Sequence, residues 1–187
     1  KAQAQDRIPF LAEGKTWTVF NYDARYEGAL VVKDSARYSV LGDTIVGSRT
    51  CKLLETEIGT VPAYQEGRNI CFYYPGDAEP RVMYEFDCQV GDLVHVDCER
   101  EARAEVTKVD SVCFEGAYYR MVHYSVDGME WRYNELIGCG TSVLNSILLP
   151  GQFRGVKVTF RGMNISEACS IKHSVKTSTS DRLASDN

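Results

Sequence analysis

The stretch from Val82 to Gly138 constrains the fold of this chain more than any other feature. Short runs of aromatic and β-branched residues recur along it, and Gly-Asp, Glu-Gly and Asp-Gly pairs separate the runs. Aromatic and β-branched residues favour strands, and glycine beside an acidic residue favours tight turns. The stretch therefore predicts antiparallel β-structure.

The best-defined unit of this stretch is a three-stranded meander. Its predicted strands are 105–114, 118–124 and 129–133, joined by tight turns at Glu115-Gly116 and Asp127-Gly128. A type I′ hairpin turn needs positive φ at both central residues, which Asp tolerates and Gly prefers. We expect Asp127-Gly128 to form such a turn and to fix the register of its two strands.

The rest of the chain shows the same pattern more weakly. Further strands are predicted at 16–22, 38–41, 44–46, 50–54, 70–74, 82–86, 93–97, 156–160 and, less regularly, 169–175, with a turn at Gly42-Asp43. Residues 141–149 instead have apolar side chains at helical spacing, which favours one or two helical turns. The predicted fold is all-β: a single antiparallel domain, a meander-based barrel or a two-layer sandwich, with at most one short helix.

The length and the ends of the chain suggest one exported domain. A chain of 187 residues, 44% of them hydrophobic, can bury one substantial core. We expect residues 1–13 to be the leader of a mature chain, 14–176 the β domain and 177–187 a polar tail. The opening KAQAQDRIPF lacks Met and resembles what remains beside a signal-peptidase site, so a periplasmic, surface or extracellular location is expected. No apolar run reaches the roughly 18 residues of a membrane-spanning helix, so no transmembrane segment is expected.

Composition also limits the partners and cofactors. The net charge is −5, from 26 acidic and 21 basic residues, which gives no reason to expect nucleic acid as a partner. The seven cysteines include no C-x-x-C pair, and the three histidines, His95, His123 and His173, fall in different predicted strands. Neither pattern predicts a metal site or a cofactor. Most cysteines are expected to be free and buried.

Four phrases occur in an order that resembles a family of uncharacterised exported proteins and lipoproteins of gut Bacteroidetes. The phrases are Gly42-Asp43-Thr44; Tyr84-x-Phe86 leading to Val90-Gly91-Asp92; Val109-Asp110-Ser111-Val112 followed by Gly116 and Arg120; and Trp131 leading to Glu135-x-Ile137-Gly138. The resemblance covers about Gly14 to Gly151. In the last phrase three residues separate Trp131 from Glu135, and Leu136 stands where glycine is usual. The resemblance implies export and a β fold, and it carries no activity.

No common catalytic motif is present, and the acidic residues do not single out a pair. There is no G-x-S-x-G, no phosphate-binding loop, no H-E-x-x-H and no G-x-G-x-x-G. Paired carboxylates could hydrolyse a glycosidic bond, but Asp92, Asp110, Glu115, Glu130 and Glu135 offer many pairs. Asp110 lies mid-strand, where Asp is disfavoured, so we expect it to bond a neighbouring turn or Arg120.

The aromatic residues give the only candidate binding site. Most of the eleven Tyr, seven Phe and two Trp are expected in the core, with Trp17 anchoring the first strand. Trp131 and Glu135 are the residues we expect to contribute to a binding surface. The sequence favours a non-enzymatic exported or surface-associated module that binds a glycan, peptide or protein. The alternatives are a hydrolase using paired carboxylates on an open β-face and a structural subunit that assembles through strand pairing.

Overall fold

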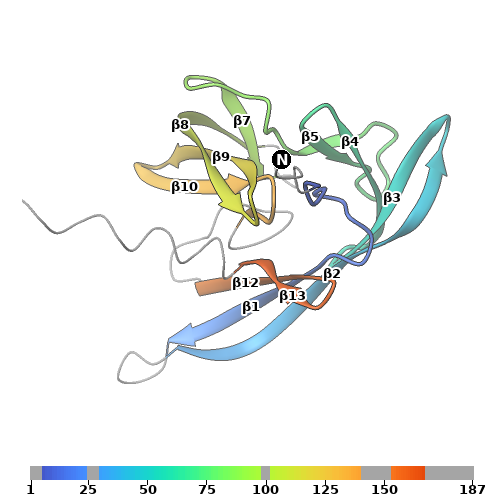
Figure 1. Cartoon of the computed structure of the whole chain (residues 1–187), viewed down its shortest axis with the longest axis horizontal. Coiled ribbons are helices and arrows are strands. Elements are labelled where there is room, and N and C mark those ends of the chain that lie inside the picture. The colour runs from blue at the N-terminus through green and yellow to red at the C-terminus, as the bar shows by residue number, and fades with distance from the viewer. Residues whose placement is uncertain (1–5, 25–29, 98–101, 140–152, 167–187) are drawn as a thin grey trace, which may run out of the picture.

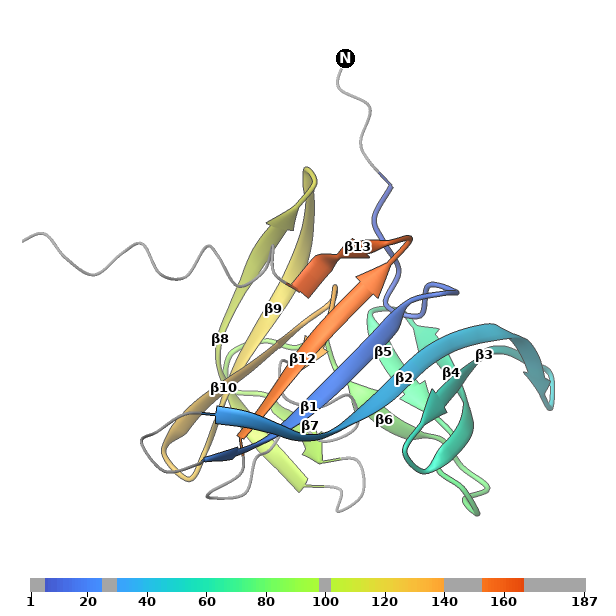
Figure 2. The same cartoon turned by 90° about the horizontal axis from the view of Figure 1, so that it is seen from below.

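The chain folds into two antiparallel sheets. The computed structural model describes residues 6–24, 30–97, 102–139 and 153–166. The larger sheet has the order β13-β12-β1-β2-β3-β4-β5-β6 and the smaller sheet has the order β11-β10-β9-β8-β7. Figures 1 and 2 show the larger sheet curling into a half-barrel, with the smaller sheet opposite β1 and β12. The predicted all-β antiparallel fold is confirmed.

The strands of the larger sheet come from both ends of the described chain. They are β1 (Thr16–Ala24), β2 (Leu30–Val46), β3 (Arg49–Thr56), β4 (Gly59–Glu66), β5 (Asn69–Phe72), β6 (Arg81–Tyr84), β12 (Phe153–Phe160) and β13 (Met163–Asn164). β12 pairs with β1, with Trp17 opposite Val158. The chain therefore returns from the smaller sheet to extend the larger one beside its first strand.

The smaller sheet contains the predicted meander. Its strands are β7 (Leu93–Asp97), β8 (Ala102–Phe114), β9 (Ala117–Val126), β10 (Met129–Asn134) and β11 (Gly138–Cys139). Asp127 and Gly128 have φ of 51° and 78°, as a type I′ turn requires. Met129 pairs with Val126 and Trp131 with Tyr124, so the predicted hairpin and its register are confirmed.

Two features of the larger sheet differ from the prediction. Gly42-Asp43 is not a turn: β2 runs through it without ending, and the register with β3 shifts between Val40 and Asp43. A β-bulge accommodates turn-type residues inside a long strand. β4, which contains Pro62, was not among the predicted strands, and proline cannot donate a hydrogen bond to a neighbouring strand. Pro62 lies beyond the last β4–β5 pair, where its carbonyl still accepts the Tyr73 N–H at 2.9 Å.

One continuous core joins the two sheets. Trp17 is fully buried on β1, and its indole Nε1 donates to the Ile137 carbonyl at 2.8 Å, so it anchors β1 as predicted. The hydroxyl of Tyr84, on β6, accepts the Cys139 N–H of β11 at 3.1 Å. The rings of Phe10, Phe86 and Tyr133 surround Tyr84, with centroids 5.1 to 5.6 Å away. The helix predicted at 141–149 and the tail at 177–187 lie outside the described residues.

Candidate ligand-binding cleft

A tight turn after β10 holds Glu135. The side-chain oxygen of Asn134 accepts the N–H groups of Leu136 at 2.9 Å and Ile137 at 3.0 Å, which closes the turn locally. The Glu135 N–H donates to the Arg120 carbonyl on β9 at 3.0 Å, and the Arg120 N–H donates back to Glu135 Oε2 at 2.6 Å. The Glu135 carboxylate is therefore fixed in place and is only 8% exposed.

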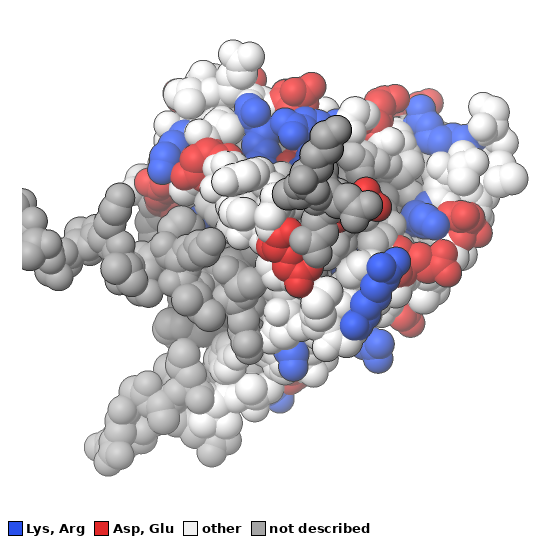
Figure 3. Space-filling view, viewed as in Figure 1, with Lys and Arg blue, Asp and Glu red and all other residues white. Residues whose placement is uncertain are grey.

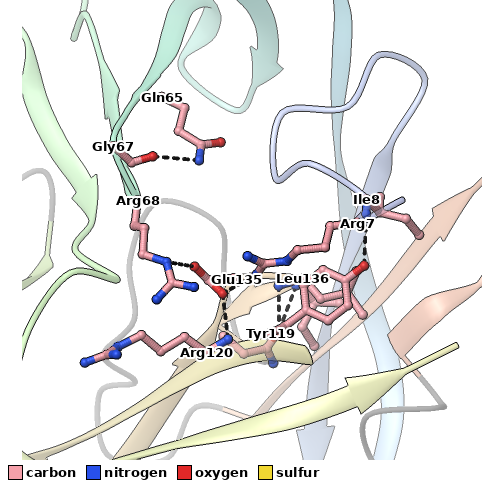
Figure 4. A network of polar contacts seen from close by, with 11 residues as sticks. Arg7, Ile8, Gln65, Gly67, Arg68, Tyr119, Arg120, Glu135 and Leu136 are labelled. Atoms are coloured by element: carbon pink, nitrogen blue, oxygen red, sulfur yellow. Dashed lines mark hydrogen bonds and ion pairs between the residues drawn. The ribbon is translucent and has the colours of Figure 1, made fainter. Parts of the chain in front are cut away.

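Two arginines from distant parts of the chain pair with this carboxylate. Arg68, in the turn between β4 and β5, places its Nε 3.1 Å from Glu135 Oε1. Arg7, from the N-terminal segment, donates from Nη2 to Glu135 Oε2. Figure 4 shows the two arginines approaching Glu135 from opposite sides. A buried carboxylate needs such partners, since an unpaired one would be costly to desolvate.

The N-terminal segment, residues 6–13, lies against the sheets. The Arg7 guanidinium lies 5.0 Å from the centre of the Tyr119 ring, and the Ile8 N–H donates to the Tyr119 hydroxyl at 2.9 Å. Phe10 is buried in the core. The fully buried Lys15 ammonium donates to the Pro9 and Phe10 carbonyls, each at 3.2 Å. The segment is therefore both part of the core and a fixed wall beside Glu135.

A cleft of about 360 Å³ opens between this segment and the β4–β5 hairpin. Its polar groups come from Arg7, Gln65, Gly67, Arg68 and Glu135, and its apolar lining comes from Ile8, Pro9, Phe10, Ile70 and Phe86. The apolar side chains Phe10, Ile70 and Phe86 are almost fully buried, so they form the floor. The arginines are close to half exposed and form the rim. An apolar floor with a few convergent polar groups is typical of ligand sites.

A second hollow of about 280 Å³ lies on the other side of the N-terminal segment. It is lined by Asp6, Ile8, Phe114, Glu115, Ala117, Tyr119, Phe160, Arg161 and Met163. Ile8 lines both hollows, so residues 6–8 form the wall between them.

The structure separates Trp131 from the cleft that Glu135 lines. Trp131 lies on β10, half-buried against the main core, and does not line either hollow. Its indole Nε1 is buried and has no hydrogen-bond acceptor among the described residues. Arg7 and Arg68, which the sequence did not single out, are the residues that Glu135 meets. No local pattern marks them, because they are brought to Glu135 only by the tertiary fold.

The mid-strand Asp110 pairs with residues other than those expected. Its Oδ2 lies 2.8 Å from the Lys108 ammonium and 3.4 Å from His123 Nε2, while the Arg120 guanidinium donates to the Cys88 carbonyl. On the other side of the His123 ring, Nδ1 lies 3.0 Å from Glu130 Oε1. Partial burial acts to raise the pKa of Asp110, but the Lys108 hydrogen bond and the His123 ring outweigh it, and the pKa is lowered. Asp110 is therefore held as a structural carboxylate.

The described cysteines are free, as expected. Cys51, Cys71, Cys88 and Cys139 are buried and Cys113 is partly exposed, whereas Cys98 and Cys169 lie outside the described residues. Burial raises the pKa of the Cys88 thiol to about 11, which leaves it protonated and unreactive. Within the same described ranges, no group of three or more His, Cys, Asp or Glu side chains is arranged to hold a metal ion.

Over residues 6–24, 30–97, 102–139 and 153–166, no helix has the length and apolar character that spanning a membrane requires. Comparison of the chain with protein-family models, with curated proteins and with solved structures gave no match. The cleft and its charges are therefore the basis for considering function.

Proposed function

We propose that the chain is a non-enzymatic binding module, exported or displayed at the cell surface, that takes a glycan, peptide or protein group into the cleft between the N-terminal segment and the β4–β5 hairpin. The observation that carries this proposal is the cleft itself. Its volume of about 360 Å³ is large enough for a small ligand or a side group of a larger one. Export rests on the ordered phrases of the sequence alone.

The charge arrangement supports binding over hydrolysis. Glycosidases with two catalytic carboxylates need both of them to face the scissile bond, about 5 to 10 Å apart. Among the described residues, Glu135 is the one acid that lines this cleft, and two arginines and a backbone N–H already engage it. Asp110 and Glu130 approach each other through His123, but neither lines the cleft.

The ion pairs and hydrogen bonds around the cleft also favour a preformed site. Arg68, Arg7 and the Arg120 backbone converge on one carboxylate, so the rim is held without a ligand. A ligand that enters a preformed rim loses less free energy to ordering of side chains.

Binding of a glycan array and pull-down of surface extracts would test the proposal, using the wild type and a variant with a filled cleft. Gln65 is exposed and extends over the cleft, so Gln65→Trp should fill it without unfolding the chain. Gln89→Trp places the same bulk at another exposed site and serves as the control. We expect wild type and Gln89→Trp to retain a ligand that Gln65→Trp loses. Retention by all three proteins, or a measured glycosidic turnover without any binding, would overturn the proposal.

A further inference from the structure

The cleft holds more positive than negative charge. Two guanidinium groups, from Arg7 and Arg68, face one carboxylate, from Glu135, which leaves one positive charge unbalanced among these three groups. The side chains of Arg7 and Arg68 are 45% and 43% exposed, so an incoming molecule can reach both. Figure 3 shows Lys and Arg side chains gathered between the positions of β5 and β7, with Asp and Glu side chains beside them. An anionic ligand would be attracted to this region.

Arg68 has two donor groups that Glu135 does not use. Its Nε forms an ion pair with Glu135 Oε1 at 3.1 Å, and its two terminal amino groups have no partner among the described residues. The guanidinium group is planar, so these two terminal amino groups lie side by side in one plane. A second carboxylate can accept both terminal N–H groups side by side, which is the strongest geometry for an arginine–carboxylate pair.

Gln65 supplies an acceptor beside these donors. Its Nε2 donates to the Gly67 carbonyl at 2.9 Å, which orients the amide and leaves Oε1 as a hydrogen-bond acceptor. Figure 4 shows Gln65 and Arg68 extending from the same hairpin toward the space above Glu135. The rim therefore combines paired donors for an anionic group with an acceptor for a hydroxyl group.

We propose, on the premise that this cleft is the binding site, that its ligand is a carboxylate-bearing sugar unit. The sugar carboxylate accepts two hydrogen bonds from the terminal amino groups of Arg68, and a ring hydroxyl donates to Gln65 Oε1. The apolar lining that a ring can reach, from the exposed Pro9 and the partly exposed Ile8, receives the C–H face of the ring.

The cleft suits a sugar better than a peptide. Peptides bound in extended form use a row of unpaired backbone groups at a sheet edge. Here the walls are a hairpin turn and the N-terminal segment, and the Pro9 and Phe10 carbonyls of that segment already accept hydrogen bonds from Lys15. The groups that remain available are side-chain donors and an amide oxygen, which match a compact ligand with hydroxyls and one carboxylate.

Isothermal titration calorimetry with small probes tests the ligand class. The probes are D-galacturonic acid, its methyl ester, D-galactose and an N-acetylated dipeptide with a free C-terminal carboxylate. Arg68→Gln removes the positive charge and keeps a hydrogen-bond donor. Arg49→Gln is the matched control, because its side chain is 40% exposed against 43% for Arg68 and it lies on Tyr64, outside the cleft lining. Far-UV circular dichroism and the urea midpoint confirm that both variants are folded.

We expect the acid to bind the wild type at least tenfold more tightly than the methyl ester or D-galactose, and to weaken as salt is raised. Arg68→Gln should lose at least tenfold in affinity for the acid, and Arg49→Gln should lose none. Equal binding of acid and methyl ester would overturn the ligand class, as would preferential binding of the dipeptide or no binding of any probe.

The Gln65→Trp variant tests separately whether the cleft is the binding site. If the sugar-acid proposal fails but Gln65→Trp still abolishes capture of a ligand from the array or extract, the cleft remains the binding site. If Gln65→Trp retains every captured ligand, the proposed function fails together with the inference built on it.

Discussion

Substitution of Gly138 tests whether the turn that carries Glu135 packs tightly against the core. Its φ is +75°, a left-handed conformation that alanine adopts at a cost of about 1 to 2 kcal/mol. A Cβ at this position would also lie 2.9 Å from the Tyr84 hydroxyl oxygen and 3.0 Å from Tyr84 Cζ. Both distances are too short for unstrained contact.

Tyr84 has little freedom to move away. It is 2% exposed, its hydroxyl accepts the Cys139 N–H, and the rings of Phe10, Phe86 and Tyr133 enclose it. Overpacking a core of this kind costs about 1 to 3 kcal/mol. With the backbone term added, Gly138→Ala should lower the free energy of unfolding by about 2 to 5 kcal/mol.

Gly128→Ala isolates the contact from the backbone strain. Gly128 has φ of +78°, nearly that of Gly138, but a Cβ there meets no atom within 4 Å. Urea denaturation followed by tryptophan fluorescence should show Gly138→Ala to be less stable than Gly128→Ala by about 1 to 3 kcal/mol, at similar m-values. Equal losses in the two variants would refute the reasoning, because they would mean that Tyr84 does not restrain this turn.

Three further predictions follow from the ion pairs and thiols. Glu135→Gln should cost about 1 to 2 kcal/mol in urea denaturation, discounted because its arginine partners are close to half exposed, and a stability equal to wild type would contradict the buried ion pairs. The pKa of Asp110 in the folded protein is lowered from 3.8, so the stabilisation that the carboxylate contributes is complete above pH 3.8 and is lost as pH falls through the folded pKa. The difference in unfolding free energy between wild type and Asp110→Asn should therefore be larger at pH 6 than at pH 3. A difference that grows on acidification would contradict the lowered pKa. Iodoacetamide at pH 8, read by peptide mass mapping, should label Cys113 in the native protein well before Cys88, whose pKa of about 11 and burial protect it; early labelling of Cys88 would contradict its placement.

The turn preferences of single residue pairs predict the meander. They fail where pairing with a neighbouring strand outweighs the preference for a turn. Asp127-Gly128 specifies its turn through its own backbone preferences, so the two flanking strands follow from the sequence. Gly42-Asp43 has similar turn chemistry, but pairing with β3 at both Val40 and Asp43 keeps β2 continuous, and the sequence does not reveal that pairing. β4 was missed, and its Pro62 is tolerated in a strand because it lies beyond the last pair of the β4–β5 ladder.

The candidate site was predictable only in part. Glu135 follows a predicted strand and belongs to the last of the four ordered phrases, so the sequence could single it out. Its partner Arg7 lies 128 residues away, in a segment expected to be a leader, and Arg68 is one turn residue among many. Trp131 was paired with Glu135 because the two are close in sequence, but β10 ends at Asn134 and the turn after it carries Glu135 to a different surface.

The contacts of the N-terminal segment have a consequence for the order in which the protein assembles. Arg7 and Ile8 bond residues 128 and 111 positions later, and Trp17 bonds a carbonyl 120 positions later. On a ribosome these first residues emerge long before their partners exist, whereas each hairpin of the meander can close as soon as it is made. The N-terminal segment is therefore synthesised well before the residues that it contacts, and Arg7, Ile8 and Trp17 cannot form these bonds until Glu135, Tyr119 and Ile137 have emerged.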